Sequence, residues 1–519
     1  MLSPSTGTIH ETINAEESED TELQIEFQEV NWNCKSDYSL FVTAKESTKL
    51  APKLHCSCCI KSKNDDKDDH YYTVEDGADA VSQRMDGVAE KLSDKMEIQV
   101  RQTVTHQPVL PTPSTKVVKK RRTRIPDRPN VSLSLWSILK NAIGKDLTKI
   151  PIPVNFSEPL SMLQRLTEDY EYSEILDSAA KCDNYTEEMC MVAAFTVSSY
   201  ACCSVRTTKP FNPLLGETFE CDRTDDKGWR CINEQVKHHP PTVAQHCEGQ
   251  GWTMWQDFTM KSKFKGNYLE LTPSGIAYLV FKTSGSIYSW RKVNTYVHNL
   301  VIGKIWVDNE GDMEILNHKT GDRCSLKYIP QTTFGKEQKK VTGLVWNKQD
   351  VIRWTLNGYW DKHMEYMEVK QQKLIDGKSD PTLKNVTEYG PTKRAWTRKI
   401  PVPESEQYYN FTEFACSLNE PEEDVAPTDS RLRPDQRLME AGRWDEANLE
   451  KLRLEEKQRN NRNNSKRGSH ESASEYDEAS PTWFKREKDP LSDLIIHISK
   501  GTYWKHKEVG DWSMCPNIY

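Results

Sequence analysis

Long apolar runs are missing from this sequence, since none approaches the roughly 20 residues that a helix needs to cross a bilayer. The first residues have neither a basic start nor an apolar stretch, so the pattern of a secretory signal is missing as well. The 14 cysteines among 519 residues are irregularly spaced and do not form the framework of a disulfide-rich protein. These absences predict a cytosolic protein whose cysteines are reduced.

Support for a metal site or a catalytic site is also weak. His55, Cys56, Cys58 and Cys59 lie together, but no second pair of cysteines at C-x-x-C spacing accompanies them, so no metal is predicted. The sequence has no G-x-S-x-G segment and offers no nucleophile that would pair with its adjacent histidines. We therefore expect a protein that is not an enzyme and that uses no cofactor.

Charge is segregated along the chain, although the net charge is only −8. Residues 1–30 hold eight acids and no Lys or Arg, whereas Lys116–Arg128 hold seven bases and one acid. The basic run lacks interleaved aromatic residues that could stack on bases, so nucleic acid is not an expected partner. The run is either a solvated linker or, as we prefer, a segment attracted to an anionic membrane surface, where each base adds about 1 kcal/mol.

The composition divides the chain into two regions. Residues 1–130 are acidic, Ser/Thr-rich and then proline-rich, without a sustained apolar pattern, which predicts disorder. Residues 131–519 would form one domain, with a helix from about Glu187 to Cys203, a charged helix at about 434–459 and an aromatic segment at 481–519 that docks back. A short apolar helix is expected within 131–148.

The part between about residues 205 and 370 has the pattern of antiparallel strands. Met260, Ser262 and Phe264 alternate with lysines, as in a half-buried strand. A domain of this length exceeds the usual size of a solid core, and a large antiparallel β-barrel around a cavity resolves the difficulty. The predicted class is mainly β with flanking helices (α+β). Turn signals recur about every ten residues, at Pro273–Gly275, Thr283–Gly285, Asp308–Gly311 and Lys319–Gly321.

Two adjacent histidines are followed by two prolines in EQVKHHPP at Glu234–Pro241. The prolines stop sheet hydrogen bonding beyond His239, which suits a strand end at the mouth of a pocket. Imidazole N–H donors there, together with the charge of Lys209, would hold a phosphate group. From side-chain chemistry alone, a structural role for the histidine pair stays open.

These segments resemble the oxysterol-binding protein family, and the resemblance covers residues from about 119 to 519. It rests on EQVKHHPP, on KPFNPLLGETFE at Lys209–Glu220 and on KIPIPVNFSEPLSMLQRLTED at Lys149–Asp169. VHNLVIGKIWVDNEGDMEILNHKTGD at Val297–Asp322 and RLRPDQRLMEAGRWDEANLEK at Arg431–Lys451 support it. The matches are long and keep their order along the chain.

The resemblance implies a nearly complete antiparallel barrel around a lipid tunnel, with an N-terminal lid. One tunnel would hold either a sterol or phosphatidylinositol 4-phosphate, and the protein would exchange the two between membranes at contact sites. A lipid-gated sensor or scaffold with little net transport is the alternative, and phosphatidylserine is an open candidate for the counter-lipid. The resemblance assigns the lipid headgroup to Lys209, Asn212, His238, His239, Lys451, Glu455 and Arg459.

Two parts of this assignment have ordinary alternatives. Lys451, Glu455 and Arg459 share one helical face, where a surface salt-bridge ladder would have the same spacing. Lys237 stands where the family usually has Ser. On a regular strand Lys237 and His238 point to opposite faces, whereas a bulged backbone would bring a third cation to the phosphate site.

The lid and the N-terminal region suggest contacts with membranes and with a receptor. The apolar stripe of the lid would cover the tunnel in water and partition into a membrane interface, unless it packs permanently on the barrel. His70–Asp76 resembles a motif that docks on an endoplasmic reticulum receptor, VAMP-associated protein, with Thr73 in place of the usual acid; an incidental acidic loop is the alternative. A cytoplasmic protein, peripheral on endoplasmic reticulum and Golgi-type membranes, is expected. The stripe consists of Leu135, Trp136, Ile138, Leu139 and Ile143.

Overall fold

The chain divides into two compact units, residues 1–80 and 81–519. In the first unit β1 (Ile9–Thr12), β2 (Leu23–Gln28) and β3 (Phe41–Glu46) form an antiparallel sheet that was not predicted. The predicted lid helix, the receptor motif and the clustered cysteines at 56–59 lie outside the described residues. The computed structural model describes residues 9–12, 23–28, 41–46, 118–130, 153–300, 303–331, 339–372, 374–375, 378–379, 386–468 and 480–519.

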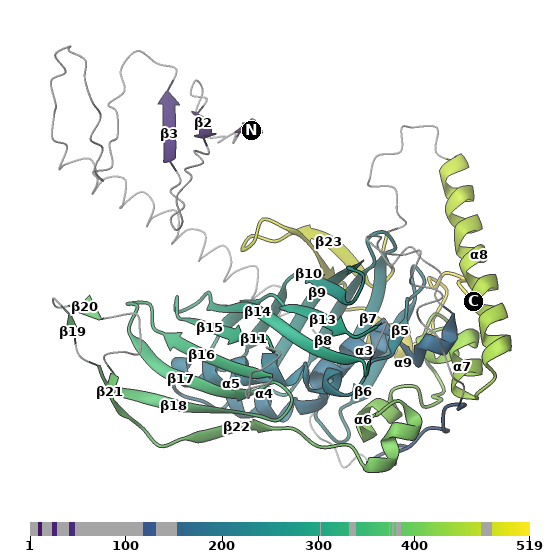
Figure 1. Cartoon of the computed structure of the whole chain (residues 1–519). Coiled ribbons are helices and arrows are strands. Elements are labelled where there is room, and N and C mark those ends of the chain that lie inside the picture. The colour runs from purple at the N-terminus through teal and green to yellow at the C-terminus, as the bar shows by residue number, and fades with distance from the viewer. Residues whose placement is uncertain are drawn as a thin grey trace, which may run out of the picture. The chain divides into compact units, whose positions relative to one another are not determined.

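One antiparallel sheet, to which 15 described strands belong, forms the body of the second unit (Figure 1). The predicted class, mainly β with flanking helices, is confirmed. Its main path is β21 (Val386–Tyr389), β18 (His363–Gln372), β17 (Ile352–Tyr359), β16 (Lys340–Trp346), β15 (Arg323–Tyr328), β14 (Trp306–Asn317), β12 (Ile287–Trp290), β11 (Ala277–Phe281), β9 (Trp252–Phe264), β8 (Thr242–Glu248), β7 (Trp229–Lys237) and β6 (Thr218–Arg223). Off this path, β10 (Leu269–Ser274) pairs with β9 and β13 (Asn294–His298), β13 pairs with β14, and β22 (Lys393–Thr397) pairs with β18.

Among the described strands, the sheet ends at β6 on one side and at β21 and β22 on the other. The edge strand β6 is covered by a chain segment from much later in the sequence. The Thr218 N–H donates to the Thr428 carbonyl at 2.9 Å, and Thr218 forms a parallel bridge with Asp429. Covering an edge in this way satisfies backbone groups that would otherwise be open to another chain.

The predicted turns are confirmed in full at two of four places. Lys319–Gly321 turns the chain between β14 and β15, where Gly321 has a φ of 77°, and Thr283–Gly285 lies between β11 and β12. At Pro273–Gly275 only Gly275 lies between strands, because Pro273 and Ser274 are the last residues of β10. The turn predicted at Asp308–Gly311 is wrong, because these residues lie inside β14. There β14 changes partner: Trp306–Glu310 pair with β13, and Gly311–Leu316 pair with β15.

Helix α5 (Tyr185–Ser198) is the central helix of the second unit. It packs across β15 to β18 and against β22, and most of its residues are buried around its circumference. A helix that is apolar on all sides belongs in an interior of this kind. The predicted helix extended to Cys203, whereas α5 ends at Ser198 and a separate 3-10 turn, η5 (Ala201–Ser204), follows.

The basic run packs on the second unit. Arg121 forms a 2.7 Å ion pair with Asp225, and Arg122 forms a 2.7 Å pair with Glu440, while Ile125 is buried in the core. The prediction that this run offers its charge to a membrane is therefore wrong for Arg121 and Arg122, because both are partly buried against carboxylates. The packed part of the domain begins before residue 131.

The predicted late helix is divided in two. α7 (Pro434–Glu440) and α8 (Trp444–Gly468) are separated at Gly442, whose φ of 76° is a conformation that glycine adopts without strain. The last segment contains β23 (Phe484–Lys488), β24 (Ile495–Ser499) and α9 (Tyr503–Val509), and its aromatic residues pack on β7 and β8. No helix within the described ranges is long and apolar enough to cross a membrane.

Candidate functional site

The two histidines of EQVKHHPP lie directly after β7. The ring centroids of His238 and His239 are 4.2 Å apart, with the ring planes inclined by 50°. His238 is half-buried and His239 is exposed. The pairing of β7 with β8 shifts register between Gln235 and Lys237, and the Gln235 side chain donates to the Lys237 carbonyl at 2.8 Å. The backbone is therefore bulged just before the histidines, and Lys237 is half-buried at the bulge.

Helix α8 is joined to this strand end by Gln458. Its Nε2 lies 3.1 Å from Nε2 of His238, and its Oε1 accepts a hydrogen bond from the Leu215 N–H at 2.7 Å. One amide thus connects three chain segments: α8, the loop that follows β5 (Lys209–Phe211), and the residues after β7. Figure 1 shows α8 and β5 at the same end of the sheet.

Buried charged side chains hold the loop of the KPFNPLLGE segment, residues 212–217, in place. Arg433 donates to the Asn212 carbonyl at 2.8 Å and to Glu217 Oε2 at 2.9 Å, and it also pairs with Asp435 at 2.7 Å. The same Glu217 oxygen accepts from the Leu214 N–H at 2.9 Å. The loop conformation therefore depends on a guanidinium group that is 2% exposed.

The exposed side of this loop carries the predicted phosphate ligands. Lys209 and Asn212 are both exposed, one at the start of β5 and the other in the loop that Gln458 contacts. On α8, Lys451 and Glu455 form an i,i+4 ion pair of 2.7 Å, and Arg459 is exposed one residue after Gln458. The ion pair agrees with the alternative interpretation of Lys451 and Glu455 as part of a salt-bridge ladder. The guanidinium group of Arg459 is a cation at the surface.

The electrostatics at the strand end keep His238 neutral. Burial, followed by the neighbouring His239 and Arg462, lowers the pKa of His238 to about 4. A neutral imidazole has one N–H donor and one acceptor nitrogen, so it serves an anion as a hydrogen-bond donor rather than as a charge. An arriving phosphate would raise the pKa of His238, because opposite charge favours the imidazolium form.

The first residue of EQVKHHPP serves a structural purpose. Both carboxylate oxygens of Glu234 accept backbone hydrogen bonds from the last segment, from Thr482 at 2.6 Å and from Trp483 at 2.9 Å. Burial raises the pKa of Glu234 to about 7, against the opposing effect of those two N–H groups. Glu234 therefore fastens the last segment to β7.

The inner side of β7, β8 and β9 carries a row of buried amides. Gln256 donates to Gln245 at 2.6 Å, Gln245 donates to Asn233 at 2.7 Å, and Asn233 donates to Thr167 at 3.0 Å. Such a chain fixes each amide orientation, because every member needs its neighbour as donor or acceptor. The interior of the sheet is thus polar at this level rather than uniformly apolar.

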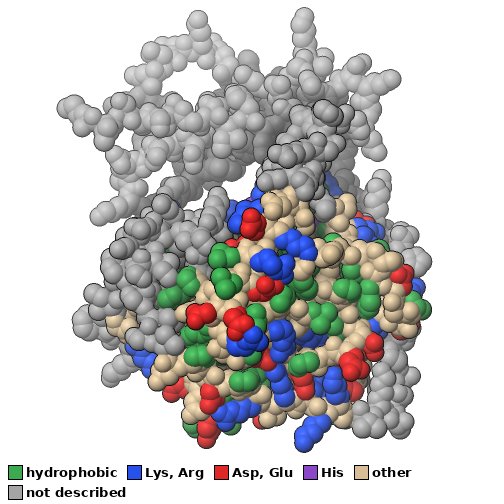
Figure 2. Space-filling model, turned by 90° about the vertical axis from the view of Figure 1, so that its right-hand side faces the viewer, with side chains coloured by type: hydrophobic (Ala, Val, Ile, Leu, Met, Phe, Trp, Pro, Cys, Tyr) green, Lys and Arg blue, Asp and Glu red, His purple; other side chains and the backbone are tan. Residues whose placement is uncertain are grey.

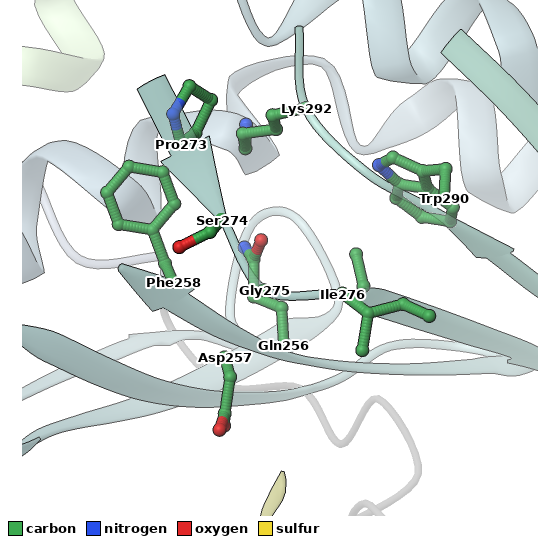
Figure 3. Close-up of a pocket in the computed structure, with 10 residues that line it drawn as sticks. Gln256, Asp257, Phe258, Pro273, Ser274, Gly275, Ile276, Trp290 and Lys292 are labelled. Carbon is green, nitrogen blue, oxygen red and sulfur yellow. The ribbon is translucent and has the colours of Figure 1, made fainter. Parts of the chain in front are cut away.

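A small cavity lies at one end of this row (Figure 3). Gln256 points toward it and Asp257 points away, as expected for successive residues of a strand. Its volume of about 10 Å³ is enough for roughly one water molecule. A cavity of this volume is too small for a lipid. Lys292, at its rim, forms a 2.8 Å ion pair with Asp169.

Two side chains near the histidine pair were not singled out by the sequence. Gln458 and Arg462 lie on the same helix as Lys451, Glu455 and Arg459, and only the fold brings them to His238. The helical spacing from Lys451 to Gln458, seven residues, was a usable signal because it marks one face. No group of three metal-binding side chains occurs in the part of the chain that the structure describes.

The face that includes α8 is mixed in character. Figure 2 views the molecule from the side on which α8 lies in Figure 1, and shows Lys and Arg side chains interspersed with acidic and hydrophobic ones. Leu449 and Leu452 of α8 are 69% and 54% exposed. Apolar and basic groups therefore lie close together on the helix that carries part of the candidate site.

The second unit is thus a mainly β fold, with one large antiparallel sheet packed on a buried helix and with imidazole and amide groups gathered at one end. The family model described as oxysterol-binding protein matches residues 134–508. The chain therefore belongs to the oxysterol-binding protein family. It is 52% identical to mouse oxysterol-binding protein 2 over 418 residues. The match covers 79% of this chain and 45% of the mouse protein.

Other relatives give the same assignment. Oxysterol-binding protein-related protein 1C of Arabidopsis thaliana is 41% identical over 409 residues, covering 77% of this chain and 47% of that protein. The chain thus spans about half the length of these two curated relatives. The Osh1 ORD domain in complex with cholesterol superimposes with a TM-score of 0.68 and 35% identity, over 77% of this chain and 95% of that domain. The Saccharomyces cerevisiae Osh3 ORD in complex with PI(4)P gives a TM-score of 0.64 at 29% identity, over 77% of this chain and 99% of that one.

Proposed function

We propose that the second unit encloses one lipid at a time, a sterol or phosphatidylinositol 4-phosphate, in a tunnel within the large sheet. It would exchange the two between membranes at contact sites. Solved relatives with this fold carry cholesterol in one case and PI(4)P in another, which supports both ligands. No bond is broken in such an exchange, so the proposal requires no nucleophile.

The observation that carries the proposal is the junction of three segments at His238. Gln458 holds α8 against the Leu215 loop and the His238 ring, so groups far apart in sequence face one end of the sheet. A phosphate monoester there would receive N–H donors from His238 and His239. In the proposal the remaining headgroup ligands are Lys209, Asn212, Lys451, Glu455 and Arg459.

Sterol and phosphoinositide would differ in their use of these groups. A sterol has no phosphate and would bind through the tunnel interior, whereas the phosphoinositide would need both the interior and the headgroup ligands. The apolar stripe of residues 131–148 would cover the tunnel in water and enter a membrane interface during loading. Residues 70–76 would hold the chain near the endoplasmic reticulum through VAMP-associated protein, opposite a Golgi-type membrane.

The proposal is tested by transfer of labelled sterol and phosphatidylinositol 4-phosphate between liposomes. His238→Ala/His239→Ala is expected to lose phosphoinositide transfer and to keep most sterol transfer. His363→Ala, a half-buried histidine on β18, is the matched control and should transfer both lipids normally. Undiminished phosphoinositide transfer by the double variant would remove the site assignment. A wild-type protein that binds both lipids and transfers neither would favour the lipid-gated scaffold.

A further inference from the structure

Two adjacent cysteines follow the central helix. Cys202 and Cys203 lie in η5, their Sγ atoms are 3.9 Å apart, and both side chains are half-buried. Neither residue belongs to the proposed headgroup site. All ten cysteines in the described ranges are free thiols. Cys202 and Cys203 differ from the others in that they are adjacent and their sulfur atoms lie close together.

A guanidinium group lies against one of the two sulfurs. Arg165 Nη2, from α3 (Met162–Thr167), is 3.6 Å from Cys203 Sγ. The hydrogen bond from the Cys202 thiol, followed by the charges of Arg165 and Arg206, lowers the pKa of Cys203 against the effect of burial. The same hydrogen bond and burial raise the pKa of Cys202. The contact with Arg165 therefore marks Cys203 as the sulfur of the pair that loses its proton more easily.

Carboxylates from other elements face the same two arginines. Glu158 of β4 (Ser157–Ser161) pairs with Arg165 at 2.9 Å and with Arg206 at 2.6 Å, and Glu168 also pairs with Arg206. Two arginines face two glutamates, so a thiolate at Cys203 adds the third negative charge of the cluster. Arg165 is the cation nearest to that charge, and its contact with the sulfur explains why the thiolate is tolerated.

Three other cysteines, Cys182, Cys190 and Cys247, have environments that do not favour a thiolate. Burial raises the pKa of Cys190 and of Cys247, both of which are fully enclosed. Cys182 is half-buried like Cys203, yet burial and the nearby Glu187 and Glu188 raise its pKa to about 11. Cys182 is therefore an internal control with similar exposure and the opposite electrostatic environment.

We propose that Cys203 is a peroxide-sensitive thiol and that Cys202 is its resolving partner. The Cys203 thiolate attacks one oxygen of hydrogen peroxide, the O–O bond breaks, hydroxide leaves, and the sulfur becomes a sulfenic acid. The Cys202 thiol then gives up its proton, its sulfur attacks the Cys203 sulfur, and the hydroxyl group leaves with that proton as water. Peroxide is reduced, and the two thiols are oxidised to one disulfide.

The resulting disulfide would be readily reversible. Consecutive Cα atoms lie about 3.8 Å apart across a trans peptide, shorter than the usual separation of roughly 4.4–6.8 Å between disulfide-bonded cysteines. A bridge between neighbours is therefore strained and easily reduced by other thiols.

The pair is connected to the KPFN loop through buried charges. Glu158, which pairs with Arg165, also accepts a hydrogen bond from the Thr208 hydroxyl at 2.9 Å, and Thr208 directly precedes Lys209. Oxidation removes the negative charge beside Arg165, which changes the charge balance at its ion pair with Glu158. We expect this change to weaken phosphatidylinositol 4-phosphate binding through Lys209. That expectation rests on the proposed function, whereas the thiol chemistry does not.

The first test measures thiol reactivity in the full chain. Iodoacetamide at about pH 6, followed by peptide mass spectrometry, is expected to modify Cys203 at least about tenfold faster than Cys182. Arg165→Gln should reduce this difference. Equal labelling rates for Cys203 and Cys182 in the wild type would overturn the proposal without recourse to any variant.

The second test follows oxidation. Hydrogen peroxide should convert wild-type protein to a form two hydrogens lighter, reversed by dithiothreitol, and dimedone should trap a sulfenic acid at Cys203 in Cys202→Ser. Oxidation of Cys203→Ser at the wild-type rate would overturn the assignment of the reactive thiol. Oxidised wild-type protein is also expected to bind phosphatidylinositol 4-phosphate vesicles about threefold more weakly than reduced protein. Unchanged vesicle binding would remove only the link to Lys209.

Discussion

Gln458 Nε2 lies 3.1 Å from Nε2 of His238, while Gln458 Oε1 accepts a hydrogen bond from the Leu215 backbone. This single side chain connects a helix to a loop and a strand end that both lie more than 200 positions earlier in the sequence. The amide nitrogen lies 3.1 Å from Nε2 and 3.5 Å from Nδ1 of the same ring, so Gln458 restricts the position of His238. The candidate site therefore depends on a residue that need not contact the lipid.

Replacing Gln458 with Ala is expected to weaken binding of phosphatidylinositol 4-phosphate about tenfold. The two hydrogen bonds contribute about 1 kcal/mol each, and their loss frees both the His238 ring and the Leu215 loop. Sterol binding should change little, since a sterol does not need the ring. Titration with vesicles containing either lipid measures both effects.

Leu452→Ala, on the exposed side of the same helix, is the control for that experiment. It removes a side chain of similar size and should leave both affinities unchanged. Equal losses of phosphoinositide and sterol binding in Gln458→Ala would show that the residue supports the fold in general, and would contradict a positioning role at His238.

The stability of the protein should depend on pH through His238. Its pKa in the folded state is about 4, against roughly 6.5 for an unperturbed histidine. Between pH of about 4 and about 6.5 the unfolded state binds more protons than the folded state. The free energy of unfolding therefore rises with pH across this range, and it falls again as the pH is lowered. Because the ring is half-buried, the contribution is at most about 2 kcal/mol.

Urea unfolding at about pH 4.5 and about pH 7.5 measures this dependence. His238→Gln has no titrating ring at this position, so the difference in unfolding free energy between the two pH values should be smaller by about 2 kcal/mol. The same pH dependence in variant and wild type would mean that His238 titrates normally in the folded protein.

Arg433→Met is expected to destabilise the second unit by about 3–5 kcal/mol. The guanidinium group is 2% exposed and pairs with Glu217 and Asp435, both fully buried, so its removal leaves two carboxylates without their cation. Arg443→Met removes an exposed arginine that pairs with Glu446 at the start of α8, and should cost less than about 1 kcal/mol. Chemical denaturation of both variants gives the comparison, and similar losses would contradict it.

The sequence was informative where a local pattern decides the structure. Met260, Ser262 and Phe264 are buried or half-buried whereas Lys261 and Lys263 between them are exposed, so β9 has the alternation that was predicted. The Lys319–Gly321 turn and the strand end before Pro240 follow from glycine and proline chemistry. These features require no knowledge of distant partners.

Prediction failed where a distant segment decides. Asp308–Gly311 has the composition of a turn, yet the strand continues because β13 and β15 supply partners in succession. Arg121 and Arg122 appeared to be free cations, and only the fold brings Asp225 and Glu440 to them. For Gln458, the helical face was visible in the sequence, but the partner His238 lies 220 residues away.

Lys237→Ser is expected to weaken phosphatidylinositol 4-phosphate binding about threefold and to reduce its salt dependence. Lys237 is half-buried at the bulge before His238, where a regular strand would direct it to the opposite face. Two unit charges about 4 Å apart in water attract by about 1 kcal/mol, so a more distant ammonium group contributes somewhat less. Lys261→Ser, an exposed lysine of β9, serves as the control for loss of charge alone. Vesicle titrations at low and high salt measure both variants. Identical affinities for Lys237→Ser and Lys261→Ser would place the Lys237 ammonium group away from the headgroup, and the bulge would then affect only the histidine geometry.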